Sequence, residues 1–270
     1  MGIKLSDLFR VTDLRLQLSD MTAKPWIGAA PQIQILRGLS FDIPKGAAVG
    51  IVGGSGSGKS TLGRALVRLL EPSGGHIQFD GVDITHLSDA QLRPLRRRFQ
   101  MIFQDPMSSL NPRHRVGTII AEPLRLHHMG DIAARVAQSL DKVGLGQSFA
   151  TRFPHELSGG QRQRVGIARA IALEPDFILA DEIVSGLDVS SQAQVLNLLE
   201  KLVGDLGLTL AFISHDLSVI RRLCSQTIVM HQGQIVENSQ TDRLFANPSA
   251  DYTRDLLAAI PLPDPNQAWH

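Results

Sequence analysis

The residues with the clearest chemistry lie in one glycine-rich segment that matches the pattern GxxxxGK[ST]. Its residues are Gly53, Gly54, Ser55, Gly56, Ser57, Gly58, Lys59 and Ser60, followed by Thr61. Glycines let backbone N–H groups surround phosphate oxygens without a Cβ atom in the way, and a helix beginning near Gly58 adds the positive end of its dipole. We expect Lys59 to reach the β- and γ-phosphates of a nucleotide and the Ser60 hydroxyl to bind Mg²⁺.

Two acids follow a short apolar run later in the chain. Residues 177–180 (FILA) have the composition of a buried strand, and Asp181 and Glu182 come directly after it. Ligands collect at this end of strands in open α/β sheets. We expect Asp181 to hold Mg²⁺, directly or through water, and Glu182 to accept a proton from an attacking water or to orient it. An ordinary solvated turn is the alternative, and the phosphate loop favours the chemical interpretation.

A second anion-binding signal is a helix start at Ser158. Ser158 and Gln161 have capping-box spacing, which by itself indicates only a well-capped core helix. That interpretation does not explain Gly159 and Gly160, since a glycine in a helix costs about 1 kcal/mol relative to alanine. We therefore expect a phosphate to approach bare backbone there.

These motifs together resemble the ATP-binding subunits of ABC transporters, and the resemblance covers almost the whole chain. It rests on the phosphate loop, on LSGGQ at residues 157–161, on the apolar run ending in Asp181-Glu182 and on His215. The resemblance implies that LSGGQ binds the γ-phosphate of ATP held by a partner subunit, so that two ATP molecules lie between two head-to-tail subunits.

The resemblance also assigns roles to single residues. Gln104 would contact Mg²⁺ and the attacking water, Asp188 would cross the dimer interface, and His215 would bond the γ-phosphate. The implied catalytic residues are Glu182, His215 and Gln104. The implied Mg²⁺ ligands are Ser60, Gln104 and Asp181. The implied contacts to the partner's ATP are Ser158, Gly159, Gly160 and Gln161, with Asp188.

Some positions depart from the family pattern. After Glu182 the family has proline followed by threonine or valine, and here the residues are Ile183 and Val184. Gly186 replaces the usual alanine, so we expect a looser segment beside the catalytic acid. Leu18 occupies the place of the adenine-stacking aromatic residue, and Trp26 is the candidate to stack on adenine instead.

Two further segments resemble the peptide and nickel importer subfamily. They are residues 103–112 (FQDPMSSLNP) and 188–197 (DVSSQAQVLN), and residues 251–261 resemble that subfamily's C-terminal extension. The resemblance implies an importer for peptides or a similar small solute, such as a nickel chelate or an opine-like compound. The implied partners are a second, different ATPase subunit, two transmembrane permease subunits and an extracytoplasmic solute-binding protein. No cysteine-rich cluster segment is present, so we predict no iron–sulfur cluster.

Composition agrees with a globular chain acting beside other membrane subunits. The sequence has 270 residues, 43% of them hydrophobic, and a formal net charge of +1, which gives no argument for nucleic acid. Cys224 is the single cysteine, as suits a reducing compartment. No apolar run is long enough to span a bilayer and no signal peptide is evident, so we expect a peripheral subunit on the cytoplasmic face of the bacterial inner membrane.

Strands and helices alternate around these motifs, which predicts an α/β fold with a parallel sheet. Strands are expected within 11–50, at 99–103, at 177–180 and in LTLAFIS, and a helix at 159–173. The predicted fold is a P-loop NTPase core of the ABC type with an antiparallel β subdomain and an inserted α-helical subdomain. The ATPase domain is expected over 1–240, the helical insertion over about 106–165, and the C-terminal extension over 241–270.

Two other functions stay open from the sequence. One is a soluble ABC ATPase serving an enzyme complex, such as a phosphonate-degrading one. The other is a regulatory nucleotide-binding module without turnover, which the intact Lys59, Asp181, Glu182 and His215 disfavour.

Overall fold

The computed structural model describes residues 6–20, 28, 30–105 and 109–259. The chain divides into two compact units, which we call unit 1 (residues 1–88 and 212–270) and unit 2 (residues 89–211). Strand β8 (Thr209–Ile213) crosses from unit 2 into unit 1. The two units are described separately below.

Unit 1 contains an antiparallel sheet with the strand order β2-β1-β4-β5. In β1, buried side chains alternate with exposed ones along part of the strand, as expected where one face of a sheet covers a core. Phe9 and Phe79 pack across that face with ring centroids 4.9 Å apart. The predicted antiparallel β subdomain is therefore present. Its strands are β1 (Asp7–Ser19), β2 (Gln32–Pro44), β4 (Gly74–Phe79) and β5 (Val82–Asp83).

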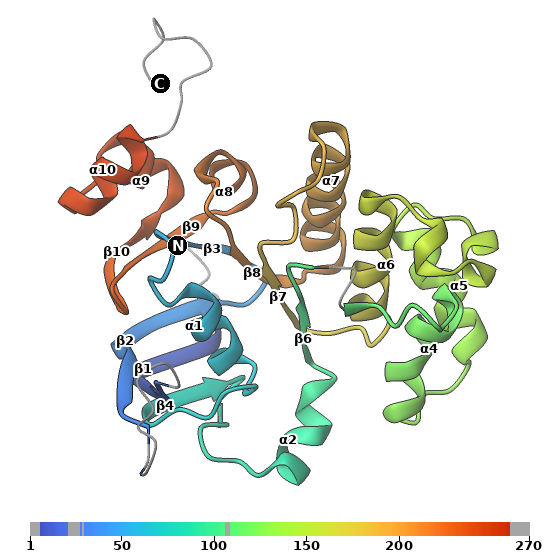
Figure 1. Cartoon of the computed structure of the whole chain (residues 1–270), viewed down its shortest axis with the longest axis horizontal. Coiled ribbons are helices and arrows are strands. Elements are labelled where there is room, and N and C mark those ends of the chain that lie inside the picture. Colours follow the sequence, from blue (N-terminus) through green and yellow to red (C-terminus); the bar gives the residue numbers. More distant parts are fainter. Residues whose placement is uncertain (1–5, 21–27, 29, 106–108, 260–270) are drawn as a thin grey trace, which may run out of the picture. The chain divides into compact units, whose positions relative to one another are not determined.

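The rest of unit 1 positions the phosphate loop. Strand β3 is buried at every residue and pairs parallel to β9, which pairs antiparallel to β10. Figure 1 shows α9 and α10 beside β10, at the red end of the chain. The elements are β3 (Ala48–Val52), α1 (Lys59–Leu66), α8 (Leu217–Leu223), β9 (Gln226–His231), β10 (Gln234–Gln240), α9 (Thr241–Ala246) and α10 (Asp251–Ala258).

Unit 2 combines a parallel strand pair with helices. Strands β6 and β7 pair in register from Phe99↔Phe177 to Ile102↔Ala180. Helices α4, α5 and α6 contact one another and form the green-to-yellow group of Figure 1. The elements are α2 (Asp89–Arg96), β6 (Phe99–Ile102), α4 (Val116–Leu126), α5 (Ile132–Lys142), η1 (Gln147–Thr151), η2 (Pro154–Glu156), α6 (Gly159–Ile171), β7 (Phe177–Asp181) and α7 (Val189–Leu206).

Most of the predicted elements are present within two residues of their expected bounds, although β1 begins at Asp7, ahead of the range 11–50 in which it was expected. The strand predicted at 99–103 is β6, the helix predicted at 159–173 is α6, and the FILA strand is β7. The stretch expected to hold a helical insertion contains α4, α5, η1 and η2 and, in its described residues, no strand. The exact domain bounds at 106–165 and 240 stay a prediction.

Candidate active site

The phosphate loop joins β3 to α1 within unit 1. Gly53, Gly56 and Gly58 all have positive φ, of 151°, 73° and 99°. Gly53 has the strictest requirement, because a Cβ atom there would lie 2.2 Å from the Met230 carbonyl oxygen at the end of β9. The loop therefore lies directly against the backbone of a neighbouring strand.

Lys59 is the first residue of α1 and is buried, with 7% of its surface exposed. Its Nζ donates to the carbonyl oxygens of Gly53, at 2.8 Å, and Gly54, at 3.0 Å. Ser60 and Thr61 follow in the first turn, where backbone N–H groups and the helix dipole favour an anion. The loop thus places a cation and a helix start together, as its sequence predicts.

His215 also belongs to unit 1. It lies between the end of β8 and the start of α8, and it is exposed. The following turn is fixed by Asp216, which caps α8 by accepting from the Ser218 N–H at 2.9 Å, while the Asp216 N–H donates to Ser214 Oγ at 2.9 Å. The chain therefore presents the imidazole at a strand end beside a well-defined helix start.

The two predicted acids end strand β7 in unit 2. Asp181 is the last residue of the strand and is 4% exposed. Glu182 is half-buried and has a left-handed backbone, with φ of 49°. Positive φ is uncommon outside glycine, and it turns the chain sharply at the residue predicted to be the general base.

Gln104 and Glu182, both predicted to be catalytic, lie together in unit 2. Gln104 Nε2 donates to Glu182 Oε2 at 3.0 Å. Gln104 is exposed and follows β6, the strand that pairs with β7. This hydrogen bond engages Oε2 of the carboxylate that is predicted to be the general base.

Apolar packing and a turn hold the segment after Glu182. Ile183 and Val184 are 1% and 5% exposed, and the Ser185 N–H and hydroxyl both donate to the Glu182 carbonyl, at 3.1 and 2.7 Å. Gly186 is exposed and has φ of 76°. The looseness that we expect here from the missing proline stays a prediction.

The LSGGQ segment begins α6 with the predicted capping box. The Gln161 N–H donates to Ser158 Oγ at 3.3 Å, and the Ser158 N–H donates to Gln161 Oε1 at 3.0 Å. Gly159 and Gly160 differ in their surroundings. A Cβ at Gly160 would lie 2.9 Å from both Cβ and Oγ of Ser191, whereas one at Gly159 would meet only Leu187, at 3.4 Å.

Packing therefore supplies a reason for Gly160 that the sequence did not reveal. Ser191 lies in the first turn of α7, where Asp188 caps the helix by accepting from the Ser191 N–H and hydroxyl at 2.9 and 2.7 Å. Both bonds lower the pKa of the Asp188 carboxyl, and the bond from the hydroxyl has the larger effect. The structure thus brings the LSGGQ segment and Asp188 together within unit 2.

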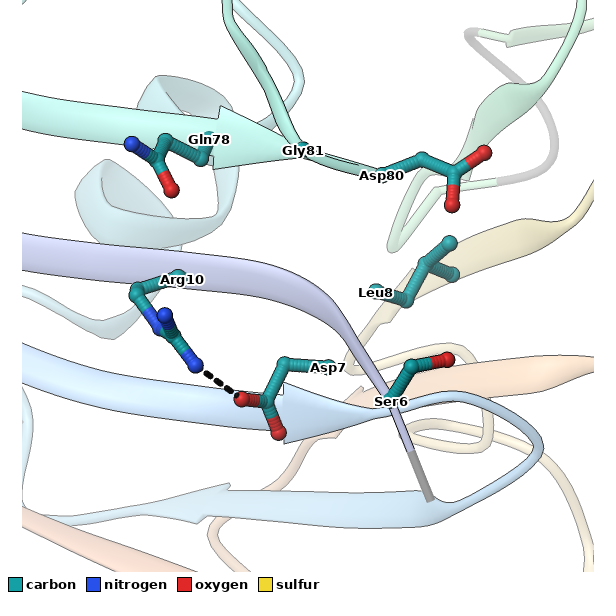
Figure 2. A pocket seen from close by; sticks show the side chains of 7 residues that line it. All are labelled: Ser6, Asp7, Leu8, Arg10, Gln78, Asp80 and Gly81. Carbon is teal, nitrogen blue, oxygen red and sulfur yellow. Dashed lines mark hydrogen bonds and ion pairs between the residues drawn. The ribbon is translucent and has the colours of Figure 1, made fainter. Parts of the chain in front are cut away.

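Trp26, the candidate adenine stacker, is outside the described residues, while Leu18 on β1 is 38% exposed. A pocket of about 500 Å³ in unit 1 contains none of the predicted site residues (Figure 2). Arg10 and Asp7 form an ion pair in it at 2.6 Å. Its lining residues are Ser6, Asp7, Leu8, Arg10, Gln78, Asp80 and Gly81.

Sequence reasoning gave no site role to Tyr252. Its hydroxyl accepts a hydrogen bond from the Gly54 N–H at 2.8 Å. Because these residues are far apart in sequence, no spacing or periodicity could have predicted the contact. Composition alone distinguishes Tyr252, as the single tyrosine of the chain.

The loop of unit 1 and the acids of unit 2 define the class of protein as a P-loop nucleotide hydrolase. Residues 36–185 match the family described as "ABC transporter". Since that match covers more than half of the 270 residues, the chain belongs to the ABC transporter family, as an ATP-binding subunit. It is an ATPase, and the fold predicted from its sequence is confirmed.

Three proteins similar to this chain are named as ATP-binding proteins of peptide or glutathione import or transport. A putative peptide import ATP-binding protein of Brucella ovis is 51% identical over 247 residues, which are 90% of this chain and 78% of that protein. The oligopeptide transport ATP-binding protein OppF of Streptococcus mutans is 49% identical over 242 residues, 88% of this chain and 79% of that protein. A glutathione import ATP-binding protein, GsiA, of Salmonella paratyphi A is 51% identical over 87% of this chain and 38% of its own length.

A solved structure agrees with the fold. The ATP-binding cassette MJ0796, in a dimeric post-hydrolysis state bound to ADP and Pi, superposes with a TM-score of 0.75 at 28% identity, covering 86% of this chain and 98% of that one. Within residues 6–20, 28, 30–105 and 109–259, no helix is both long enough and apolar enough to cross a membrane.

Proposed function

We propose that this chain is the ATP-hydrolysing subunit of an importer for peptides or a similar small solute. One observation carries the catalytic part, namely the hydrogen bond from Gln104 to Glu182 at the end of a buried strand. The solute class is supported by the printed names of the relatives from Brucella, Streptococcus and Salmonella. The alternative of a soluble ATPase for an enzyme complex has no such support.

The chain's own residues divide the work in this proposal. Lys59 and the N–H groups of the phosphate loop bind the phosphates of ATP, and His215 adds a contact to the γ-phosphate. Glu182 takes a proton from the attacking water while Gln104 holds the carboxylate in one orientation. Ser158, Gly159, Gly160 and Gln161, with Asp188, serve the ATP bound by a partner subunit.

Mg²⁺ is proposed with ligands from Ser60, Gln104 and Asp181. The donors fit, because Mg²⁺ prefers oxygen ligands and takes only one or two carboxylates beside phosphates and water. Asp181 is a buried carboxylate at a strand end, which suits this role. When bound, the ion neutralises charge that develops on the transferred phosphoryl group.

The assembly is proposed from the same relatives. A dimer of cassettes, as in MJ0796, would close on ATP and drive two transmembrane permease subunits. We propose a different ATPase chain as the second cassette, a solute-binding protein on the far side of the membrane, and a place for this chain on the cytoplasmic face of the bacterial inner membrane.

The decisive variant is Glu182→Gln. It keeps the shape of the side chain and removes the base, so ATP hydrolysis should fall at least about a hundredfold while ATP binding persists. Glu174→Gln is the matched control, because the Glu174 carboxylate is exposed and forms an ion pair with Arg135, at 3.4 Å. Unchanged turnover in Glu182→Gln would contradict the assigned base. Recovery of the chain with soluble enzymes alone, and never with permeases, would contradict the importer.

A further inference from the structure

The C-terminal helix α10 contributes one side chain to the phosphate loop. The Tyr252 hydroxyl accepts from the Gly54 N–H at 2.8 Å, and both residues belong to unit 1. A Cβ atom at Gly54 would lie 3.0 Å from that hydroxyl oxygen, so the hydroxyl sits against bare backbone. The phosphate loop is therefore in direct contact with the last described helix.

The same peptide unit is held from its other side by Lys59. The Gly53 carbonyl accepts from Lys59 Nζ at 2.8 Å. In a trans peptide the C=O of one residue and the N–H of the next point in opposite directions. Tyr252 and Lys59 thus hold the two ends of the Gly53–Gly54 peptide unit.

This double attachment matters because both residues of the peptide unit are glycines. Glycine has access to more backbone conformations than any other residue, so the unit can rotate easily unless its polar groups are held. Rotation would carry the Gly53 carbonyl away from Lys59. The Tyr252 hydroxyl opposes that rotation by accepting from the Gly54 N–H.

Tyr252 is itself fixed in place. Its ring packs on His231, the last residue of β9, with ring centroids 4.0 Å apart. The start of α10 is anchored by Glu237 on β10, which is 7% exposed and accepts from the N–H groups of Ser249 and Ala250 at 3.1 and 3.0 Å. Packing on His231 thus holds the Tyr252 ring, and the Glu237 carboxylate holds the start of the helix that carries it.

We propose that Tyr252 is a positioning residue for nucleotide binding, which holds the Gly53–Gly54 peptide unit so that Lys59 is oriented toward the phosphates. This inference rests on the proposed binding of ATP by the phosphate loop. The positioning role of Tyr252 makes α10 a determinant of the affinity for ATP.

The test compares Tyr252→Phe with wild type in the full-length chain. The substitution removes only the hydroxyl, and one neutral hydrogen bond corresponds to about a 2- to 10-fold effect. We expect the Kd and the KM for ATP each to rise by about 2- to 10-fold. The Kd is titrated without Mg²⁺ so that no turnover occurs. The kcat at saturating ATP should stay within about twofold of the wild-type value, since the substitution changes the affinity for ATP and not the hydrolysis step.

Arg254→Ala is the matched control on the same helix. Arg254 is exposed and donates to the Pro248 carbonyl at 3.0 Å, so its loss perturbs α10 without touching the loop. We expect its Kd for ATP to match wild type. Amide hydrogen exchange at Gly54 should accelerate in Tyr252→Phe and not in Arg254→Ala.

The possible results distinguish a failure of the positioning role of Tyr252 from a failure of the proposed function. An unchanged Kd in Tyr252→Phe would overturn the positioning role. A lowered kcat with an unchanged KM would also overturn it, because that result indicates partial unfolding, which reduces the active fraction without changing affinity. An equal rise in both variants would also overturn it. If wild type itself binds no ATP, the proposed function fails instead.

Discussion

Gly159 and Gly160 are adjacent in the LSGGQ segment, yet the structure predicts opposite effects on stability when each is replaced by alanine. At Gly159 the new Cβ would meet Leu187 Cδ2 at 3.4 Å, an ordinary contact with the end of a flexible side chain. Alanine is favoured over glycine in helices by about 1 kcal/mol, so Gly159→Ala should raise the free energy of unfolding by up to about 1 kcal/mol.

Gly160→Ala should be destabilising instead. Its Cβ would lie 2.9 Å from two atoms of Ser191, whose position is fixed by the bonds to Asp188. Overpacking of this kind costs about 1–3 kcal/mol, so a net loss of up to about 2 kcal/mol is expected after the gain in helix propensity. The two variants should therefore differ by about 1–3 kcal/mol in free energy of unfolding.

Urea denaturation without nucleotide measures this difference, from midpoints at unchanged slope. Ser191→Gly removes the two atoms that would lie 2.9 Å from the Gly160 Cβ and keeps the N–H that donates to Asp188. Adding it should therefore reduce the cost of Gly160→Ala. Equal stability of the two alanine variants, or no rescue by Ser191→Gly, would refute the packing argument.

The same pair tests the expected phosphate contact. Gly159 has no packing requirement in unit 2, so its glycine is best explained by the close approach of a ligand to backbone. Gly159→Ala should then lower ATP hydrolysis in the assembled transporter by about tenfold or more while the fold stays stable. Full ATP hydrolysis in a stable Gly159→Ala protein would contradict a phosphate contact there.

Three further results are expected. Gly53→Ala should cost about 3 kcal/mol or more, because its Cβ would lie 2.2 Å from the Met230 carbonyl, whereas Gly56→Ala meets nothing within 4 Å and should cost about 1 kcal/mol through its positive φ; thermal unfolding of both variants measures the difference. Burial raises the pKa of Glu237, but N–H donors from Ala250 and Ser249 outweigh it and lower the pKa overall. The stability that this carboxylate contributes should therefore be complete above a pH of about 4.3, the ordinary glutamate value, and be lost as pH falls through the lower folded value. Unfolding of wild type and Glu237→Gln across pH 3–7 should show a difference that shrinks toward low pH, and a constant difference would contradict the assignment. Burial also raises the pKa of the Cys224 thiol well above its usual range, so alkylation should be slow in the native chain and fast in urea, and equal rates would contradict that burial.

Local patterns predicted most of the elements and motifs. The apolar run at 177–180 became most of the buried strand β7, and the Ser158–Gln161 spacing became the observed capping box. These features depend on neighbours within a few residues, which sequence patterns record. The fold class followed from them and is confirmed by the solved cassettes.

What the sequence could not show depends on contacts between distant residues or on unusual backbone. The Tyr252 bond to Gly54 joins residues far apart in the chain, and the Ser191 contact explains Gly160 only once α6 and α7 are folded. The left-handed backbone of Glu182 has no local signal, since a glutamate rarely adopts it.

That left-handed glutamate carries a consequence for engineering. Glycine at position 182 would relieve about 1 kcal/mol or more of backbone strain, because φ of 49° suits glycine better than any side chain. A search for variants that resist heat would thus reward loss of the proposed base. Stability and turnover are opposed at this one residue, so thermostable forms of this ATPase must be sought elsewhere in the chain.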